Sequence, residues 1–306
     1  EVGAITEEAV SIAKASATLK TGKGVELAPV ESVTARWESK FKIDPFDVKA
    51  EDKISLLLEA DALMRKNPQV RIASGSMWCM REDKVFASTE GSYIEQVKTE
   101  TGAGIEAMAT DGREMQRRSY PNSAGGDCGS VGYEMVLDLD LSEHAERIAS
   151  EAVALLSAKQ CPNLDTTLIL DSSQLTLQVH ESCGHPIELD RVFGQEASYA
   201  GTSFLTPEKQ GTFRYGSEQV NIVADATLPG GLGSFGYDDE GVPGQRVSVI
   251  DEGIFKNYLS SRETASELGQ LSTGAMRADG WNRIPIIRMT NVNLEPGDWT
   301  LDEMIK

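Results

Sequence analysis

Apolar side chains recur every three to four residues in three parts of the first half of the chain, and each stripe predicts a helix. Helices are expected over residues 6–17, 50–66 and 142–158, with Asn67-Pro68 ending the second and Ser142 capping the third. Between the second and third helices the period changes to two. Residues 69–80, 84–90, 92–100 and 103–109 therefore predict an antiparallel meander of short strands, joined by turns at Glu82-Asp83, Glu90-Gly91 and Thr101-Gly102. The stretch 18–50, broken by Pro29 and Pro45, predicts irregular structure with short strands.

A Gly-rich loop over residues 121–132 and an alternating strand over 133–139 complete the first half. The second half begins after Cys161-Pro162-Asn163, which breaks the chain and marks a domain boundary. A β-branched run predicts a strand at 166–170, and Asp171 then caps a helix that continues to His185. Further strands are expected at 221–225 and 288–294, with a hairpin at 246–259 and a polar connection at 264–274.

These elements predict an α+β protein with two domains. Residues 1–163 form an N-terminal domain of helices and an antiparallel sheet, and residues 164–306 form a mostly β C-terminal domain that carries one helix with unusual chemistry. The chain begins at Glu1 without a methionine and stops at Lys306, just after a predicted helix start, so we expect it to be a fragment.

Composition narrows the function. The 306 residues carry a formal net charge of −19, which argues against a nucleic-acid partner because phosphate binding needs clustered Lys and Arg. Four cysteines without a CxxC pair predict a reducing, cytoplasmic compartment. The sequence holds no apolar run long enough to span a bilayer, so no membrane partner is expected.

The helix after Asp171 contains the sequence HESCGH, at positions 180–185. Two histidines and a glutamate are the components of a hydrolytic zinc site. His180 and His185 would be ligands, and Glu181 would accept a proton from the attacking water and pass it to the leaving amine. On residue types and spacing alone, surface or packing roles for these histidines remain open.

The spacing HExxxH is one residue longer than the familiar HExxH. Five residues of regular helix subtend about 140°, so the two imidazoles would diverge. A π-bulge, which adds one residue to a turn, would return them to one face. Pro186 cannot donate to the carbonyl of Ser182, and Gly184 is permissive, so the sequence offers a local cause for such a bulge.

The neighbouring residues leave alternatives open. Cys183 is expected to be a small buried residue, although a nucleophile activated by a neighbouring histidine is another interpretation. Glu188 is either a metal ligand, a partner that orients an imidazole, or a solvated surface residue. Cys128 is expected to be a loop residue, with a nucleophile as the alternative, and His144 is expected to be a surface residue.

Four stretches together resemble the TldD/PmbA family of cytoplasmic peptidases once described as modulators of DNA gyrase. They are HESCGHPIELD at 180–190, YDDEGVPG at 237–244, VIDEGIFKNYL at 249–259 and RMTNVNLEPGD at 288–298. Their order and spacing fit the family, and the HExxxH motif matches its metal-bearing, TldD-like branch.

The resemblance implies a zinc metallopeptidase with His180 and His185 as Zn²⁺ ligands and Glu181 as the catalytic base. It implies a third ligand from a cysteine beyond residue 306, which none of the four cysteines here matches. It also implies an extended or unfolded peptide as substrate, and either a TldE/PmbA-like partner subunit or a homodimer.

Two competing functions remain from the sequence. One is a non-catalytic peptide-binding subunit of a TldD/TldE-like complex, which would bind its partner and peptide without metal dependence. The other is a cysteine hydrolase, in which alkylation of Cys183 would abolish activity and a chelator would not.

Overall fold

The computed structural model describes residues 2–19 and 24–305. It combines helices with largely antiparallel sheets, so the predicted α+β class is confirmed. Part of the predicted irregular stretch 18–50, residues 20–23, lies outside the described residues, as do Glu1 and Lys306. In the described part of the chain, no helix is long and apolar enough to cross a membrane.

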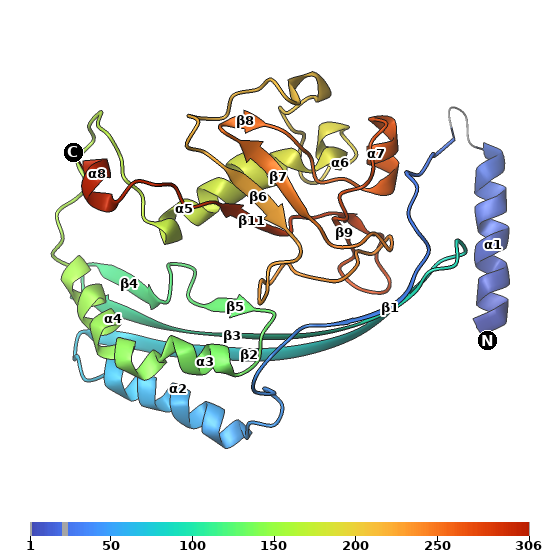
Figure 1. Cartoon of the computed structure of the whole chain (residues 1–306). Helices are drawn as coiled ribbons and strands as arrows, with labels where there is room; N and C mark the ends of the chain where they lie inside the picture. The colour runs from blue at the N-terminus through green and yellow to red at the C-terminus, as the bar shows by residue number, and fades with distance from the viewer. Residues whose placement is uncertain (1, 20–23, 306) are drawn as a thin grey trace.

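The first half is built on one long hairpin, β2 (Val70–Ala87) and β3 (Tyr93–Thr110), seen across the middle of Figure 1. The outer edge of β3 pairs in turn with three short strands. These are β1 (Thr34–Glu38, parallel), β5 (Asp127–Gly129) and β4 (Met115–Tyr120).

The long hairpin corrects the predicted meander. The turn near Gly91 exists, but the expected turns at Glu82-Asp83 and Thr101-Gly102 do not, because those residues continue the ladder. Gly102 serves packing instead of a turn. A Cβ at this position would lie 2.4 Å from Nε1 of Trp78, on the paired strand.

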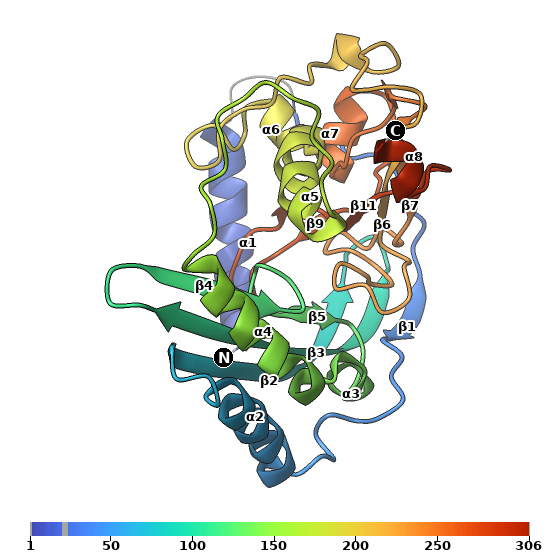
Figure 2. The ribbon, with the colours of Figure 1, turned by 90° about the vertical axis from the view of Figure 1, so that its left-hand side faces the viewer.

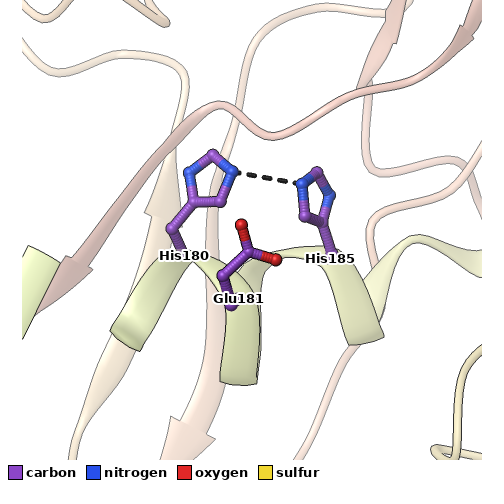
Figure 3. Close-up of side chains that lie close together, drawn as sticks. All are labelled: His180, Glu181 and His185. Atoms are coloured by element: carbon purple, nitrogen blue, oxygen red, sulfur yellow. Dashed lines mark hydrogen bonds between the residues drawn. The ribbon is translucent and has the colours of Figure 1, made fainter. Parts of the chain in front are cut away.

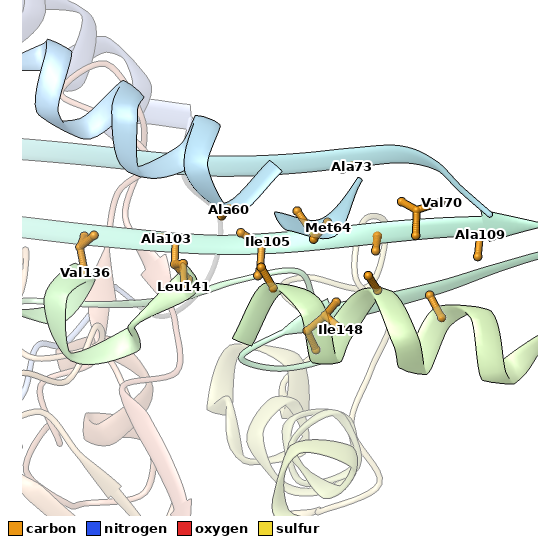
Figure 4. Packing of buried hydrophobic residues seen from close by; sticks show 14 of the residues in the cluster. Ala60, Met64, Val70, Ala73, Ala103, Ile105, Ala109, Val136, Leu141 and Ile148 are labelled. Atoms are coloured by element: carbon orange, nitrogen blue, oxygen red, sulfur yellow. The ribbon is translucent and has the colours of Figure 1, made fainter. Parts of the chain in front are cut away.

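Helices α2 (Ala50–Met64) and α4 (Leu141–Leu155) pack against each other and against the hairpin, close to the predicted ranges. Met64, Ile105 and Ile148 are among the residues that fill this first core (Figure 4). The residue before α4 is Asp140 in a left-handed conformation without a side-chain cap, so the predicted Ser142 cap is wrong.

Two predicted strands are absent. Residues 133–139 contain the helix α3 (Glu134–Leu139) in place of a strand. Contacts with distant residues hold this helix in place: the Glu134 carboxylate accepts the backbone N–H groups of Lys42 and Ile43 at 3.0 and 2.9 Å, and Val136 is buried. Residues 166–170 are mainly exposed and irregular; although β-branched, they pair with no strand in the described chain.

The second half holds a four-stranded antiparallel sheet in the order β11-β6-β7-β8, formed by Asn291–Leu294, Ile222–Asp225, Arg246–Asp251 and Ile254–Phe255. A separate two-stranded ladder joins β9 (Met276–Arg277) and β10 (Ile286–Ile287). The short helices are α5 (Ser172–Val179), α6 (Leu189–Val192), α7 (Arg262–Glu267) and α8 (Leu301–Ile305). Because α7 occupies part of 264–274, that stretch is more than a polar connection. Leu189, Phe255 and Ile287 belong to a second buried core.

Figures 1 and 2 both show these C-terminal elements on the side of the long hairpin opposite α2. Polar contacts connect the two halves. The Gln96 amide of β3 donates to the Tyr237 carbonyl at 2.8 Å, Lys84 of β2 pairs with Asp239 at 2.6 Å, and Arg262 pairs with Glu90. Helix α1 (Val2–Leu19) buries none of its residues and stands at one side of the molecule in Figure 1.

Candidate metal centre

The segment that carries HESCGH follows α5 directly. The Asp171 carboxylate accepts the N–H of Ser173 at 2.9 Å and caps the helix, as predicted. The helix then widens into a π-helical turn over His180–Gly184, in which the N–H of His185 donates to the His180 carbonyl. The predicted π-bulge is therefore present at the expected residues.

Tertiary contacts hold this turn. Pro186 has no N–H to offer the Ser182 carbonyl, and the Tyr215 hydroxyl donates to that oxygen instead, at 3.0 Å. Gly184 has an ordinary helical φ of −60°, so conformational freedom is not its role. A Cβ there would lie 2.1 Å from Sδ of Met289, and glycine is required by this close packing.

The π turn brings the two histidines together, as Figure 3 shows. The Nε2 atoms of His180 and His185 lie 3.1 Å apart. Two nitrogens bound to one tetrahedral zinc at about 2.0–2.1 Å each would be separated by about 3.4 Å, close to the observed spacing. Glu181 offers a carboxylate oxygen in the same group, with all three ligand atoms within 4.8 Å of one another. The donor set fits a zinc ion with Glu181 beside it.

Glu188 fixes the ring of His185. Its Oε2 lies 2.8 Å from His185 Nδ1 and also accepts from the Arg191 guanidinium, while its side chain is fully buried. An acceptor at Nδ1 places the neutral ring's proton there and leaves Nε2 free to bind a metal. Of the three interpretations left open for Glu188, the geometry favours the imidazole-orienting partner. Its Oε1 atom is buried and has no hydrogen-bond partner among the described residues.

His180 is held in its neutral form more strongly than a free imidazole. Removal from water is the largest cause of its lowered pKa, and the neighbouring His185 is the next. Glu181 and Glu188 oppose the shift. Since only a neutral imidazole binds a metal, the lowered pKa favours ligation near neutral pH.

Cys183 does not join this group. It points into the second core, is 6% exposed, and burial raises the pKa of its thiol to about 11. A buried thiol with that pKa is a poor nucleophile, as the small-residue prediction implied.

Cys128 and His144 lie in the first half of the chain. Burial raises the pKa of the Cys128 thiol, and the ring of His144 lies against the ring of Tyr120, with 4.0 Å between the ring centroids.

Three residues that support the site were not predicted from the sequence. Arg191 lies three residues after Glu188, a spacing that could have suggested an ion pair on one helix face. Asp190, whose pKa burial raises to about 6, accepts the N–H of Ile287 at 3.1 Å. Tyr215 gave no local signal, because its partner lies 33 residues away.

Comparison with known proteins gives two family matches. Residues 165–306 match the PmbA/TldA metallopeptidase C-terminal domain, and residues 43–156 match the PmbA/TldA metallopeptidase central domain.

Curated relatives agree. The chain is 32% identical to metalloprotease MJ0996 of Methanocaldococcus jannaschii, over all of this chain and 64% of the relative. It is 32% identical to a zinc metalloprotease TldD homolog of Saccharolobus solfataricus, over 45% of this chain and 29% of the relative. A Methanothermobacter thermautotrophicus metalloprotease is 31% identical, over 86% of this chain and 54% of the relative. The chain thus spans about half to two thirds of the length of the relatives that match most of it.

Solved structures share the fold. TldE from Thermococcus kodakarensis superposes with a TM-score of 0.62 at 18% identity, covering 94% of this chain and 62% of that one. A Thermotoga maritima protein described as a modulator of a DNA gyrase gives a TM-score of 0.67 at 22% identity, covering 94% and 59%.

Proposed function

The chain belongs to the PmbA/TldD metallopeptidase family, and from this premise we propose that it is part of a zinc-dependent peptidase acting on extended or unfolded peptides. The observation that carries the proposal is the 3.1 Å separation of the His180 and His185 Nε2 atoms on a π turn, with Glu181 beside them. The relative described as a zinc metalloprotease supports zinc as the metal.

In this proposal, His180 and His185 hold the zinc ion through Nε2, and Glu188 keeps the His185 ring in the required tautomer. Bound zinc supplies Lewis acidity, which polarises a peptide carbonyl and makes water acidic enough to attack at neutral pH. The Glu181 carboxylate accepts the proton of the attacking water and transfers it to the leaving amine.

The third ligand is proposed to be a cysteine beyond residue 306, as the family resemblance implies. Cys183 is buried away from the histidines' ligand atoms. We further propose a cytoplasmic location and pairing with a TldE/PmbA-like subunit or a second copy. The structural likeness to TldE is compatible with such pairing but bears on the fold alone.

The test is metal analysis and peptide hydrolysis by the full-length protein and its Glu181→Gln variant. We expect stoichiometric zinc in both, and a kcat about 10²- to 10⁴-fold lower in the variant, since it lacks the proton acceptor. Glu218→Gln, at an exposed position of the same half, is the matched control and should retain the wild-type rate.

Absence of zinc from the active wild type, or equal rates for wild type and Glu181→Gln, would refute the mechanism. Binding of peptide and partner without metal dependence would instead favour the non-catalytic subunit.

A further inference from the structure

Two arginines, Arg277 of β9 and Arg288 directly after β10, belong to a ladder that contacts the segment carrying the metal centre. Arg277 lies opposite Ile286, and the N–H of Arg288 donates to the Ala275 carbonyl at 2.9 Å. Directly opposed residues and residues two apart share one face of a ladder, so Arg277 and Arg288 rise from the same face. Ile287 lies on the other face and is buried in the second core.

The ladder is fixed to the metal-binding segment on both sides of Arg288. The N–H of Ile287 donates to Asp190 at 3.1 Å. Met289 packs so closely on Gly184 of the π turn that a Cβ on Gly184 would overlap its sulfur. Arg288 therefore lies beside the turn that carries His180. The positive charge of Arg288 contributes to the lowered pKa of His180, after removal from water and the effect of His185.

Neither guanidinium has a counter-ion. Across residues 2–19 and 24–305, no ion pair or side-chain hydrogen bond involves Arg277 or Arg288, whereas Arg191 and Arg262 are both paired with carboxylates. This is notable in a chain with a net charge of −19.

The acidic groups around Arg277 already have partners. Asp239 pairs with Lys84 at 2.6 Å, and Glu100 pairs with Lys98 at 2.5 Å. The third acid, Glu188, pairs with Arg191. Among the described charges that act on Arg277, the arginines Arg277 and Arg288 are the cations without an ion pair.

The electrostatic surroundings of Arg277 come mainly from the protein and from Arg288. Its side chain is exposed to water, yet desolvation by the surrounding protein, followed by the charge of Arg288, lowers its pKa. Residues from both halves of the chain act on it, Glu100 from β3 and Asp239 from the 229–244 loop. Two like charges that act on each other repel, and a bound anion would relieve that repulsion.

We propose that Arg277 and Arg288 form a subsite that binds a carboxylate of the peptide substrate next to the metal centre. The inference rests on the proposed peptidase function and specifies its substrate class as peptides with a carboxylate near the cleaved bond. Planar guanidinium groups match a carboxylate through paired N–H donors. The carboxylate belongs either to the C-terminus of the peptide or to an Asp or Glu side chain.

The test compares four versions of one unfolded peptide with the full-length zinc-loaded protein. They carry a free or amidated C-terminus, and Glu or Gln beside the cleaved bond. We expect kcat/KM for one carboxylate version to exceed that of its amide by about 10- to 100-fold. The pair that shows the preference identifies the source of the carboxylate.

Arg277→Gln and Arg288→Gln should reduce that preference toward unity, with KM rising more than kcat falls, and the corresponding Lys variants should restore part of it. Arg113→Gln removes the same charge from the exposed β3–β4 turn and should keep the preference. Equal kcat/KM for both carboxylate–amide pairs in the wild type would overturn the subsite without any variant. Equal losses on acid and amide peptides in the Gln variants would also overturn it.

A binding measurement separates this inference from the proposed function. Fluorescence anisotropy with the Glu181→Gln protein should show tighter binding of the preferred acid peptide, and Arg288→Gln in that background should weaken it. If no peptide is cleaved in a metal-dependent way but this difference persists, the peptidase proposal fails and the subsite stands. If cleavage is metal-dependent and the difference is absent, the subsite fails alone.

Discussion

Replacement of Gly184 by alanine tests whether packing against Met289 holds the π turn. The added Cβ would lie 2.1 Å from Sδ of Met289, 3.3 Å from its Cγ and 3.4 Å from its Cε. Carbon and sulfur atoms in contact normally stay about 3.5–4.0 Å apart, so the overlap with sulfur is about 1.5 Å. Overpacking of this kind costs about 1–3 kcal/mol, and the helical preference of alanine over glycine offsets up to about 1 kcal/mol.

The assay is a double-mutant cycle with Met289→Ala, measured by denaturant unfolding. We expect Gly184→Ala alone to lower the free energy of unfolding by about 1–2 kcal/mol. Combined with Met289→Ala it should cost about 1–3 kcal/mol less than the sum of the single changes, because the shortened side chain removes the clash. Gly3→Ala is the control, since that helical glycine has nothing within 4 Å of its added Cβ.

Zinc affinity should follow the same cycle. If Met289 stays in place, the turn must shift and separate the Nε2 atoms of His180 and His185, so Gly184→Ala should bind zinc more weakly. The double variant should recover part of the affinity, measured by competition with a chromophoric chelator. Additive unfolding energies together with unchanged zinc affinity would refute the role given to this contact.

Three further outcomes are expected. Glu188→Gln should weaken zinc binding about 10- to 100-fold in the same chelator competition, because it weakens the hydrogen bond that orients His185; unchanged affinity would contradict that role. Iodoacetamide should label exposed Cys161 well before Cys183, because burial raises the pKa of the Cys183 thiol to about 11. Mass spectrometry of the folded protein measures the order of labelling, and labelling of Cys183 first would contradict this expectation. Burial raises the pKa of Glu240 to about 7, so ionising this carboxyl costs more in the folded than in the unfolded protein, and stability falls as pH rises from about 4.5 to about 7. The stability of Glu240→Gln relative to wild type, measured by thermal unfolding, should therefore increase over that pH range. A constant difference would contradict this.

Local sequence was sufficient to predict the distorted helical turn of the candidate site. The HExxxH spacing and Pro186 predicted a π-bulge, and the structure places one at His180–Gly184. Helices α2 and α4 were also predictable, because a helix with an apolar stripe is recorded in consecutive residues. The reason given for Gly184 was wrong, since its φ is ordinary and its role depends on Met289, more than 100 residues away in the chain.

Strand pairing and side-chain burial could not be predicted from neighbouring residues alone. The break expected at Thr101-Gly102 is continuous strand, because those residues pair with Cys79 and Trp78 across the hairpin. Residues 166–170 have strand-forming side chains but no partner strand in the described structure, and β propensity is realised only where a neighbour exists.

The sequence by itself determined the groups of the candidate centre: two imidazoles, one carboxylate and the extra residue that aligns the imidazoles. Only the tertiary structure decided which residues support that centre. Buried Glu188 accepts from the His185 ring, and the Tyr215 hydroxyl donates to the Ser182 carbonyl, which receives no hydrogen bond from Pro186. The ladder that carries Arg277, followed by Arg288, lies next to this segment. The physical reason is that helical geometry and ligand type are encoded in neighbouring residues. Burial, ion pairing and close packing depend on side chains that meet only when distant segments fold together.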